Sequence, residues 1–216
     1  MGRPKRIILV RHGQSTGNLD KSAYQLKQDS ALEITEKGKL QVELAALELR
    51  NKVESGANIF YVSPYSRTRQ TATILQQRLG GDWREDPRLR EQEWHNRIHD
   101  AIISPTYGSD MHKEQLEYGQ FFYRFAGAES CADVYDRASS FLDSLYRHFE
   151  KPDFPENCFI ITHGCFMRVF LMRWMHWTVE AFENLKNPRN AEYWTLERQD
   201  DGKYKLIAEL NWIDLT

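Results

Sequence analysis

The sequence predicts an α/β three-layer sandwich built around a mostly parallel central sheet. Three short runs are almost wholly apolar and rich in β-branched or aromatic residues: residues 7–10, 59–62 and 158–162. Each run ends in a polar turn, and a helical pattern follows each time. Strands buried on both faces have this composition, and alternation of such strands with helices is typical of parallel sheets covered by helices.

The first strand, residues 7–10, leads directly into Arg11 and His12. A polar stretch follows, and Thr35 then has the side chain of a helix N-cap. After it we expect a helix whose buried face is formed by four leucines: Leu40, Leu44, Leu47 and Leu49.

The second and third units repeat this order. Strand 59–62 is followed by a helix over residues 67–79, which a pair of glycines ends. Strand 158–162 runs into His163 and then into a helix over about residues 166–177. The carboxyl ends of all three strands therefore carry polar side chains, where open parallel sheets bind their ligands.

A long segment separates the second unit from the third. Ser130, with Asp133 three residues later, resembles a capping box and opens a helix that reaches about Phe149. We interpret residues 95–128, which precede it, as a small helical cap. This cap would be inserted in a single domain of residues 1–216, a length suited to one hydrophobic core.

The chain closes with the signal of a β-hairpin. Alternating apolar and polar residues over 193–196 and 204–210 flank the turn formed by Asp200, Asp201 and Gly202. An antiparallel hairpin at this point means that the sheet is not wholly parallel.

Bulk composition excludes several classes of function. The 29 basic and 31 acidic residues are interleaved and give a net charge of -2, so the chain lacks the electrostatic footprint of a nucleic-acid-binding protein. No apolar run approaches the roughly 20 residues that cross a bilayer, so we expect no membrane insertion. Three scattered cysteines are too few for a disulfide framework, and a cytoplasmic location is the default expectation. The sequence does not indicate an oligomeric state.

The strand ends bring four chemically suited side chains into one region: Arg11, His12, Arg67 and His163. Arginine matches phosphate oxygens with two parallel N–H donors and stays charged. Histidine can act near neutral pH as a nucleophile, a proton carrier or a cationic donor. This set predicts an anion site suited to phosphoryl transfer.

At this point the sequence resembles the histidine phosphatase superfamily, the phosphoglycerate mutase-like proteins. Residues 11–18 read Arg-His-Gly-Gln-Ser-Thr-Gly-Asn, like the nucleophile loop of that family. Residues 63–72, 89–91 and 162–164 continue the resemblance in the order of the family. Two further segments are similar to a small eukaryotic subgroup of mutase-like proteins and broad-range acid phosphatases: residues 121–125 and 129–137.

The resemblance implies a role for each matching residue. His12 would attack phosphorus in line, and Glu91 would be the general acid for the leaving oxygen and then the base for the hydrolytic water. The phosphate would be held by Arg11, Asn18, Arg67, His163 and Gly164. The substrate would be a small phosphorylated molecule, and the resemblance implies no metal or other cofactor.

The chemistry of attack sets conditions on the two histidines. His12 must be neutral at the attacking nitrogen, with its other N–H donated to an acceptor that fixes the tautomer, for which a backbone carbonyl near Gly13 is a candidate. His163, as an oxyanion donor, is expected to be protonated. Gln14 and Ser15 lie on the same loop, where contact with phosphate and stabilisation of the loop remain equally open readings.

The acid has a rival and a neighbour that departs from the family pattern. Glu93 lies two residues after Glu91 and would share its face in an extended segment, but only Glu91 matches the position of the family acid. His95 stands where the family commonly has glycine, so its side chain could reshape the pocket. The four-residue spacing of His95 and His99 would also suit a zinc site on a helix, but no glutamate follows His95, and we expect surface histidines.

Two other functions use the same residues. A phosphoglycerate mutase would return the phosphoryl group to the substrate and needs a second anion grip, for which the cap offers only Arg97, Lys113 and Arg124. A pseudoenzyme would bind phosphorylated ligands without turnover, but every expected catalytic residue is present. Hydrolysis by a phosphatase is the first choice. Tyr123 and Arg124 have no assigned role, although the resemblance places them where such proteins select substrates.

Overall fold

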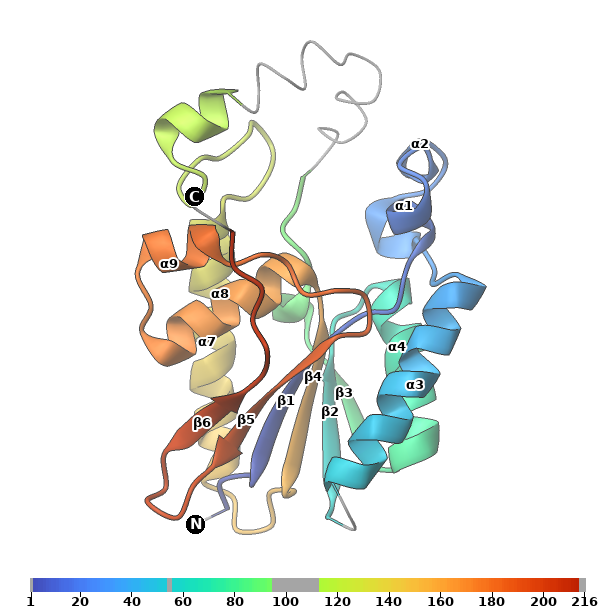
Figure 1. Cartoon of the computed structure of the whole chain (residues 1–216), viewed down its shortest axis with the longest axis vertical. Helices are drawn as coiled ribbons and strands as arrows, with labels where there is room; N and C mark the ends of the chain where they lie inside the picture. Colours follow the sequence, from blue (N-terminus) through green and yellow to red (C-terminus); the bar gives the residue numbers. More distant parts are fainter. Residues whose placement is uncertain (1, 54–55, 95–112, 214–216) are drawn as a thin grey trace.

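A computed structural model shows the predicted three-layer α/β sandwich and describes residues 2–53, 56–94 and 113–213. Its sheet has six strands in the order β3-β2-β4-β1-β5-β6 (Figure 1). The strands are β1 (Arg6–Arg11), β2 (Asn58–Val62), β3 (Asp82–Glu85), β4 (Asn157–Thr162), β5 (Tyr193–Arg198) and β6 (Tyr204–Ile207).

The three predicted strands lie at the centre of this sheet and are parallel. β4 pairs with β1 on one side and with β2 on the other, so that Val10, Ile161 and Val62 are in register. Their side chains are buried on both faces of the sheet because helices cover both faces. The register aligns the carboxyl ends of β1, β2 and β4 at one edge, which is where the predicted site residues follow.

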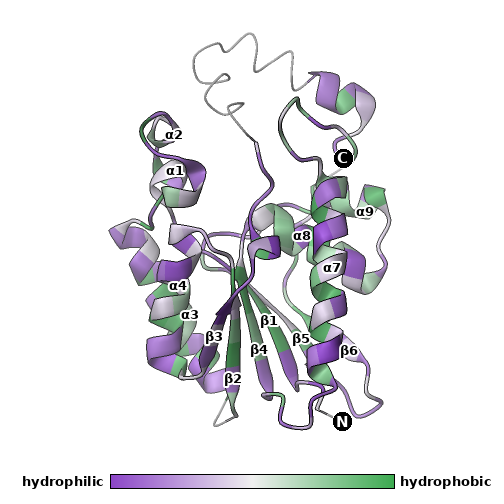
Figure 2. Ribbon diagram, turned by 180° about the vertical axis from the view of Figure 1, so that it is seen from behind, coloured by the Kyte–Doolittle hydropathy of each residue, from purple (hydrophilic) through white to green (hydrophobic). Residues whose placement is uncertain are grey.

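Helices form the two outer layers (Figures 1 and 2). One layer consists of α3 (Glu36–Val53) and α4 (Ser66–Leu79). The other consists of α7 (Cys131–Phe149), α8 (Gly164–Met175) and α9 (Val179–Asn184). Short helical elements in the connections include α1 (Thr16–Leu19), α2 (Ala23–Leu26), η1 (Asp29–Ala31) and η2 (Pro87–Leu89).

The two faces of β1 show how the sequence divides the core. Ile7 and Leu9 pack in the cluster that includes α7 and α8, whereas Ile8 and Val10 pack in the cluster that includes α3 and α4. Alternate side chains of a strand point to opposite faces, so one apolar run contributes to both cores.

The prediction of the buried face of α3 was wrong. Leu40, Leu44 and Leu47 are 66%, 63% and 54% exposed, and only Leu49 of the four leucines is buried. The face that contacts the sheet is formed instead by smaller side chains and Leu49: Val42, Ala45, Ala46, Leu49 and Val53.

Helix capping follows the predicted pattern. The Thr35 hydroxyl accepts a hydrogen bond from the Gly38 N–H at 3.0 Å, which confirms Thr35 as the cap of α3. Ser130 and Asp133 form the predicted capping box at the start of α7, which ends at Phe149. Gly80, with φ of 67°, ends α4 in a conformation that favours glycine.

The closing hairpin is also confirmed, because β5 and β6 pair antiparallel. β5 pairs antiparallel with β1 as well, so the sheet is mixed. Residues 95–112 of the expected cap lie outside the described residues. Residues 113–118 are helical, and Phe121 packs against Phe182 of α9 with ring centroids 5.3 Å apart. Among the described residues, no helix is long and apolar enough to span a membrane.

Candidate active site

The carboxyl edge of the parallel strands brings together the predicted arginines and histidines. Arg11 ends β1 and His12 follows it, while His163 follows β4. The rings of His12 and His163 meet edge to face with centroids 5.2 Å apart. Arg67 lies in the first turn of α4 and is close enough to influence the charge state of both histidines.

His12 is buried and its orientation is fixed. Its Nδ1 lies 2.7 Å from the carbonyl oxygen of Gly13, which confirms the predicted acceptor. Because a carbonyl only accepts, Nδ1 carries the proton and Nε2 keeps its lone pair. Burial, followed by the charges of Arg67 and Arg11, lowers the pKa of His12 well below its usual value, so the ring is neutral at neutral pH.

Two glycines set the position of the loop after His12 against α3. A Cβ on Gly13 would lie 2.5 Å from the carbonyl oxygen of Gly38, and a Cβ on Gly38 would lie 2.3 Å from the carbonyl oxygen of Gln14. The loop can approach the helix this closely only because neither residue has a side chain. Gly13 N–H also donates to the Thr71 hydroxyl of α4 at 3.1 Å, which ties the loop to the helix of Arg67.

His163 is fully buried, and its Nε2 lies 2.8 Å from the Ser63 hydroxyl at the end of β2. Its Nδ1 is also buried and has no hydrogen-bond partner among the described residues. Burial and then the charge of Arg67 lower its pKa well below the usual value. The expectation that His163 is protonated therefore fails for the protein alone, because several cations surround a ring that water does not reach.

Arg11, like His163, has only some of its buried nitrogen atoms in hydrogen bonds. Its Nη1 donates to the carbonyl oxygen of Pro188 at 2.5 Å, but its Nε is buried without a partner in the described chain. Burial is the main cause that lowers its pKa, and nearby Glu91 counteracts this effect. Buried polar atoms are normally paired, so Arg11 Nε and His163 Nδ1 mark a place for a polar ligand.

Arg67 has a partner that the sequence did not indicate. Asp29 of η1 accepts from Nη1 at 2.8 Å and from Nη2 at 3.2 Å, and its backbone carbonyl accepts from Nη1 at 2.6 Å. The guanidinium also lies over the ring of Tyr65, 4.9 Å from the centroid. Arg67, which the sequence predicts to bind phosphate, is thus held in a fixed orientation by the carboxylate of Asp29.

Asn18 and Ser15 stabilise the turn that follows His12. They form a capping box at the start of α1, in which the Ser15 hydroxyl accepts from the Asn18 N–H. The Asn18 Oδ1 also accepts from Nδ2 of Asn190 at 3.0 Å, so its own amide nitrogen remains available to donate. The contacts of Ser15 therefore support a role in stabilising the loop. Gln14 has a similar role, because its backbone carbonyl accepts a hydrogen bond from the Thr35 N–H.

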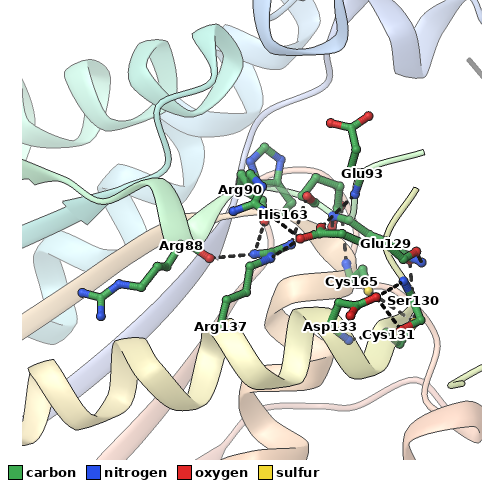
Figure 3. Close-up of polar contacts among 12 residues, drawn as sticks. Arg88, Arg90, Glu93, Glu129, Ser130, Cys131, Asp133, Arg137, His163 and Cys165 are labelled. Atoms are coloured by element: carbon green, nitrogen blue, oxygen red, sulfur yellow. Dashed lines mark hydrogen bonds and ion pairs between the residues drawn. The ribbon is translucent and has the colours of Figure 1, made fainter. Parts of the chain in front are cut away.

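Glu91 lies just after η2 and contacts the first turn of α8. Its Oε1 accepts from the Gln92 N–H at 3.1 Å, and its Oε2 from the Cys165 N–H in the first turn of α8 at 3.4 Å. The backbone N–H of Glu93 instead donates to Glu129 at 3.0 Å, and Figure 3 shows the Glu93 side chain directed away from that contact.

The loop after α9 supplies site neighbours that sequence reasoning missed. Pro188 contacts Arg11, Asn190 contacts Asn18, and Asn187 lies 3.1 Å from the place of a Cβ on Gly164. No local pattern distinguishes these residues from an ordinary polar loop. Their position follows only from the pairing of β5 with β1, which returns the chain to the neighbourhood of His12.

The predicted residues of the cap divide between described and undescribed parts. His95, Arg97 and His99 lie outside the described residues. Arg124 forms an ion pair with Asp133 of α7, and the Tyr123 hydroxyl donates to Glu114 at 2.5 Å. No group of three metal-ligating side chains occurs within residues 2–53, 56–94 and 113–213.

Comparison with known proteins agrees with this geometry. The sequence is 41% identical to the phosphoglycerate mutase-like protein AT74 of Arabidopsis thaliana, over 94% of this chain and 68% of that protein. It is 27% identical to the broad-range acid phosphatase DET1 of Saccharomyces cerevisiae, over 98% of this chain and 91% of that protein.

Solved structures share the fold. A mycobacterial glucosyl-3-phosphoglycerate phosphatase in complex with VO3 superposes with a TM-score of 0.68 at 23% identity, covering 94% of this chain and 97% of that one. YhfR of Bacillus stearothermophilus superposes with a TM-score of 0.72 at 21% identity, covering 94% of this chain and 96% of that one. Residues 7–211 match the sequence pattern of one family, and the chain belongs to it: the histidine phosphatase superfamily, branch 1.

Proposed function

We propose that this protein is a phosphatase that hydrolyses small phosphate monoesters through a phosphohistidine intermediate on His12. The observation that carries the proposal is the fixed tautomer of His12. Its Nδ1–H is held by the Gly13 carbonyl at 2.7 Å, so its Nε2 is a neutral nucleophile beside buried cations. The names of the relatives, a broad-range acid phosphatase among them, support the same reaction class.

The reaction proceeds in two displacements. In the first, Nε2 of His12 forms a bond to phosphorus while the bond from phosphorus to the ester oxygen breaks, and Glu91 gives its proton to the leaving oxygen. In the second, water attacks phosphorus, Glu91 takes the proton of that water, and the bond between nitrogen and phosphorus breaks. Inorganic phosphate leaves, and His12 and Glu91 return to their starting protonation states.

The remaining site residues act on the charge of the transferring group. Arg11 Nε and His163 Nδ1 are buried atoms that lack partners in the described chain, and a phosphate oxygen would satisfy each. Binding of a dianion raises the pKa of His163, because the charged imidazolium is then paired. Arg67, Asn18 and Gly164 complete the cradle in this proposal.

Phosphatase activity is favoured over mutase activity by the state of one cap cation, Arg124. A mutase must hold a second phosphate or carboxylate while the intermediate reorients. Arg124, one of three cations that the sequence offered for this purpose, is committed to Asp133 of α7. We assign the cap to residues 95–128 of a single domain, with a role in substrate choice, and we assign the protein to the cytoplasm.

A screen of phosphorylated metabolites tests this function when free phosphate and isomerised product are scored separately. We expect phosphate release to dominate. Protein quenched during turnover should carry acid-labile phosphate on His12, and His12→Ala should abolish both turnover and label while the far-UV circular dichroism spectrum is unchanged. A label on His163 would reverse the roles of the two histidines, and isomerised product without free phosphate would make the protein a mutase.

A further inference from the structure

The segment that carries Glu91 has no regular secondary structure of its own. Residues 91–94 follow η2 and belong to neither a helix nor a strand. A carboxylate must be held within a fraction of an ångström to transfer a proton efficiently, and a misplacement of about 1 Å can cost about 100-fold in rate. The position of Glu91 therefore depends on side chains from elsewhere in the fold.

Arg137 of α7 holds the start of this segment together with the residues just before it. Its Nη1 donates to the carbonyl oxygens of Arg88 and Arg90 at 2.6 and 2.7 Å, and its Nη2 donates to that of Glu91 at 3.1 Å. One guanidinium thus holds three carbonyl groups within four consecutive residues. The Arg137 side chain is only 10% exposed, so water does not compete strongly for these bonds.

Glu129 holds Arg137 and grips the same segment from its other end. Its two carboxylate oxygens accept from Nε and Nη2 of Arg137 at 3.1 and 3.0 Å. It also accepts from the N–H of Glu93 at 3.0 Å, and its own N–H donates to the Glu93 carbonyl at 2.8 Å. Figure 3 shows this network, with Arg137 and Glu129 between the segment and α7.

Contacts of Glu91 and its neighbours then place the carboxylate relative to His163. The Thr162 hydroxyl of β4 donates to the Leu89 carbonyl at 2.7 Å, and the Cys165 N–H of α8 donates to Glu91 Oε2 at 3.4 Å. These two donors flank His163 in the sequence. Without Arg137, the segment would keep these contacts and those with Glu129, but the carbonyl groups of Arg88, Arg90 and Glu91 would lose their shared donor.

A largely buried ion pair such as Arg137 with Glu129 is a poor source of stability, because desolvating two charges offsets most of their attraction. It can still select one conformation of a segment that has no helix or strand geometry. We propose that Arg137 and Glu129 are positioning residues for Glu91, which hold the acid in place for proton transfer. The inference rests on the proposed function, because it takes Glu91 as the acid.

The test compares an alkyl phosphate with p-nitrophenyl phosphate in the first, phosphoenzyme-forming turnover, measured by rapid quench. The nitrophenolate leaves without a proton, so its rate reports everything except acid catalysis. Arg137→Lys keeps a positive charge but cannot hold three carbonyls and a carboxylate together, and Glu129→Gln keeps the shape of the side chain. For both variants we expect the alkyl rate to fall about 10- to 100-fold and the aryl rate less than about threefold.

Arg173→Lys is the matched control. Arg173 links α8 to α7, through the Ser139 hydroxyl at 3.1 Å, but among the described residues it forms no hydrogen bond or ion pair with residues 88–93. Its ratio of alkyl to aryl rates should equal that of the wild type. Thermal unfolding of all variants distinguishes loss of the fold from displacement of the Glu91 carboxylate. If Arg137→Lys is poorly folded, Glu129→Gln tests the proposal.

Combination with Glu91→Gln separates the inference from the function on which it rests. When the acid is absent its position no longer matters, so Arg137→Lys should not change the alkyl to aryl ratio further. If Glu91→Gln alone shows no selective alkyl defect, the acid role fails and the positioning role fails with it. If that defect is present but Arg137→Lys and Glu129→Gln slow both substrates equally, only the positioning role is overturned.

Discussion

Arg67 and Asp29 form a two-point ion pair at the edge of the site, with Nη1 and Nη2 of the arginine on the two carboxylate oxygens at 2.8 and 3.2 Å. Arg67 is 4% exposed and Asp29 29% exposed. A guanidinium has five N–H donors, and Asp29 uses three when its backbone carbonyl is included. Arg67 therefore offers a phosphate only Nε and the second hydrogen of Nη2.

The first prediction is that Asp29→Asn strengthens the binding of inorganic phosphate. The carboxylate brings a negative charge close to an incoming dianion, and the amide keeps one acceptor for Nη1 while removing that charge. We expect the dissociation constant for inorganic phosphate to fall on the order of tenfold at low salt. Calorimetric titration at two ionic strengths measures it, and weaker binding by the variant would show that Asp29 serves mainly to orient Arg67.

The second prediction is that Arg67→Ala lowers kcat/KM by about 10²- to 10³-fold, which is the usual cost of one charge-stabilising donor in the transition state. Arg69→Ala is the control, since Arg69 lies on the same helix but is exposed and pairs with Glu85. Thermal unfolding must accompany the kinetics. Unchanged kcat/KM in a folded Arg67→Ala protein would remove the residue from the phosphate cradle.

The third prediction distinguishes the two carboxylates of the acid segment. Glu91→Gln should slow the first turnover of alkyl phosphates by about 10²- to 10⁴-fold and spare p-nitrophenyl phosphate, because only the alkoxide needs a proton. Glu93→Gln is the control and should leave the ratio of the two rates unchanged. A selective alkyl defect in Glu93→Gln would move the acid role two residues along the chain.

The strands were predictable because their signal is local. Residues 7–10, 59–62 and 158–162 are apolar runs that only burial on both faces explains, and all three form central parallel strands. The face of α3 was not predictable from leucine spacing. Small residues such as Ala45 and Ala46 line its sheet side, and the same helix approaches the loop after His12 closely at Gly38.

The candidate site also has contacts that the sequence predicts and contacts that it does not. The His12 tautomer depends on the next residue along the chain, so sequence reasoning reached its partner, Gly13. The Arg67 contact with Asp29 spans 38 residues and involves a short 3₁₀ turn that has no sequence signature. Residues 129–137 form a recognisable motif in the sequence. The contacts of Arg137 with the backbone around Glu91 follow only from the packing of α7 on η2.

The fourth prediction concerns stability and the two kinds of leucine on α3. Leu49 is fully buried, so Leu49→Ala should lower the free energy of unfolding by about 2–5 kcal/mol through lost burial and the cavity left behind. Leu44→Ala is the matched control on the same helix, and its change should stay within about 0.5 kcal/mol. Urea unfolding measures both, and a large effect at Leu44 would indicate that its exposed face is covered in solution.

The fifth prediction is that the free energy of unfolding falls as the pH drops below about 6.5, the unfolded value for histidine. Burial and neighbouring arginines lower the pKa of both His12 and His163 well below that value in the folded state. Between the folded and unfolded pKa values the unfolded chain binds more protons, so stability is complete above pH 6.5 and is lost on acidification. Each such proton contributes a slope of about 1.4 kcal/mol per pH unit.

Urea unfolding between pH 5.5 and 7.5 measures this slope while carboxylates still titrate little. His148, whose pKa is also lowered by burial, adds to the slope of the wild type, so the comparison uses variants. His163→Asn should reduce the slope by the contribution of up to one proton. His176→Asn is the control and should leave the slope unchanged, because His176 is exposed. The left-handed backbone at residue 176 tolerates asparagine, so this variant should fold. Equal slopes in the two variants would mean that His163 accepts a proton in the folded protein as readily as in the unfolded chain, and that burial and the surrounding arginines do not lower its pKa.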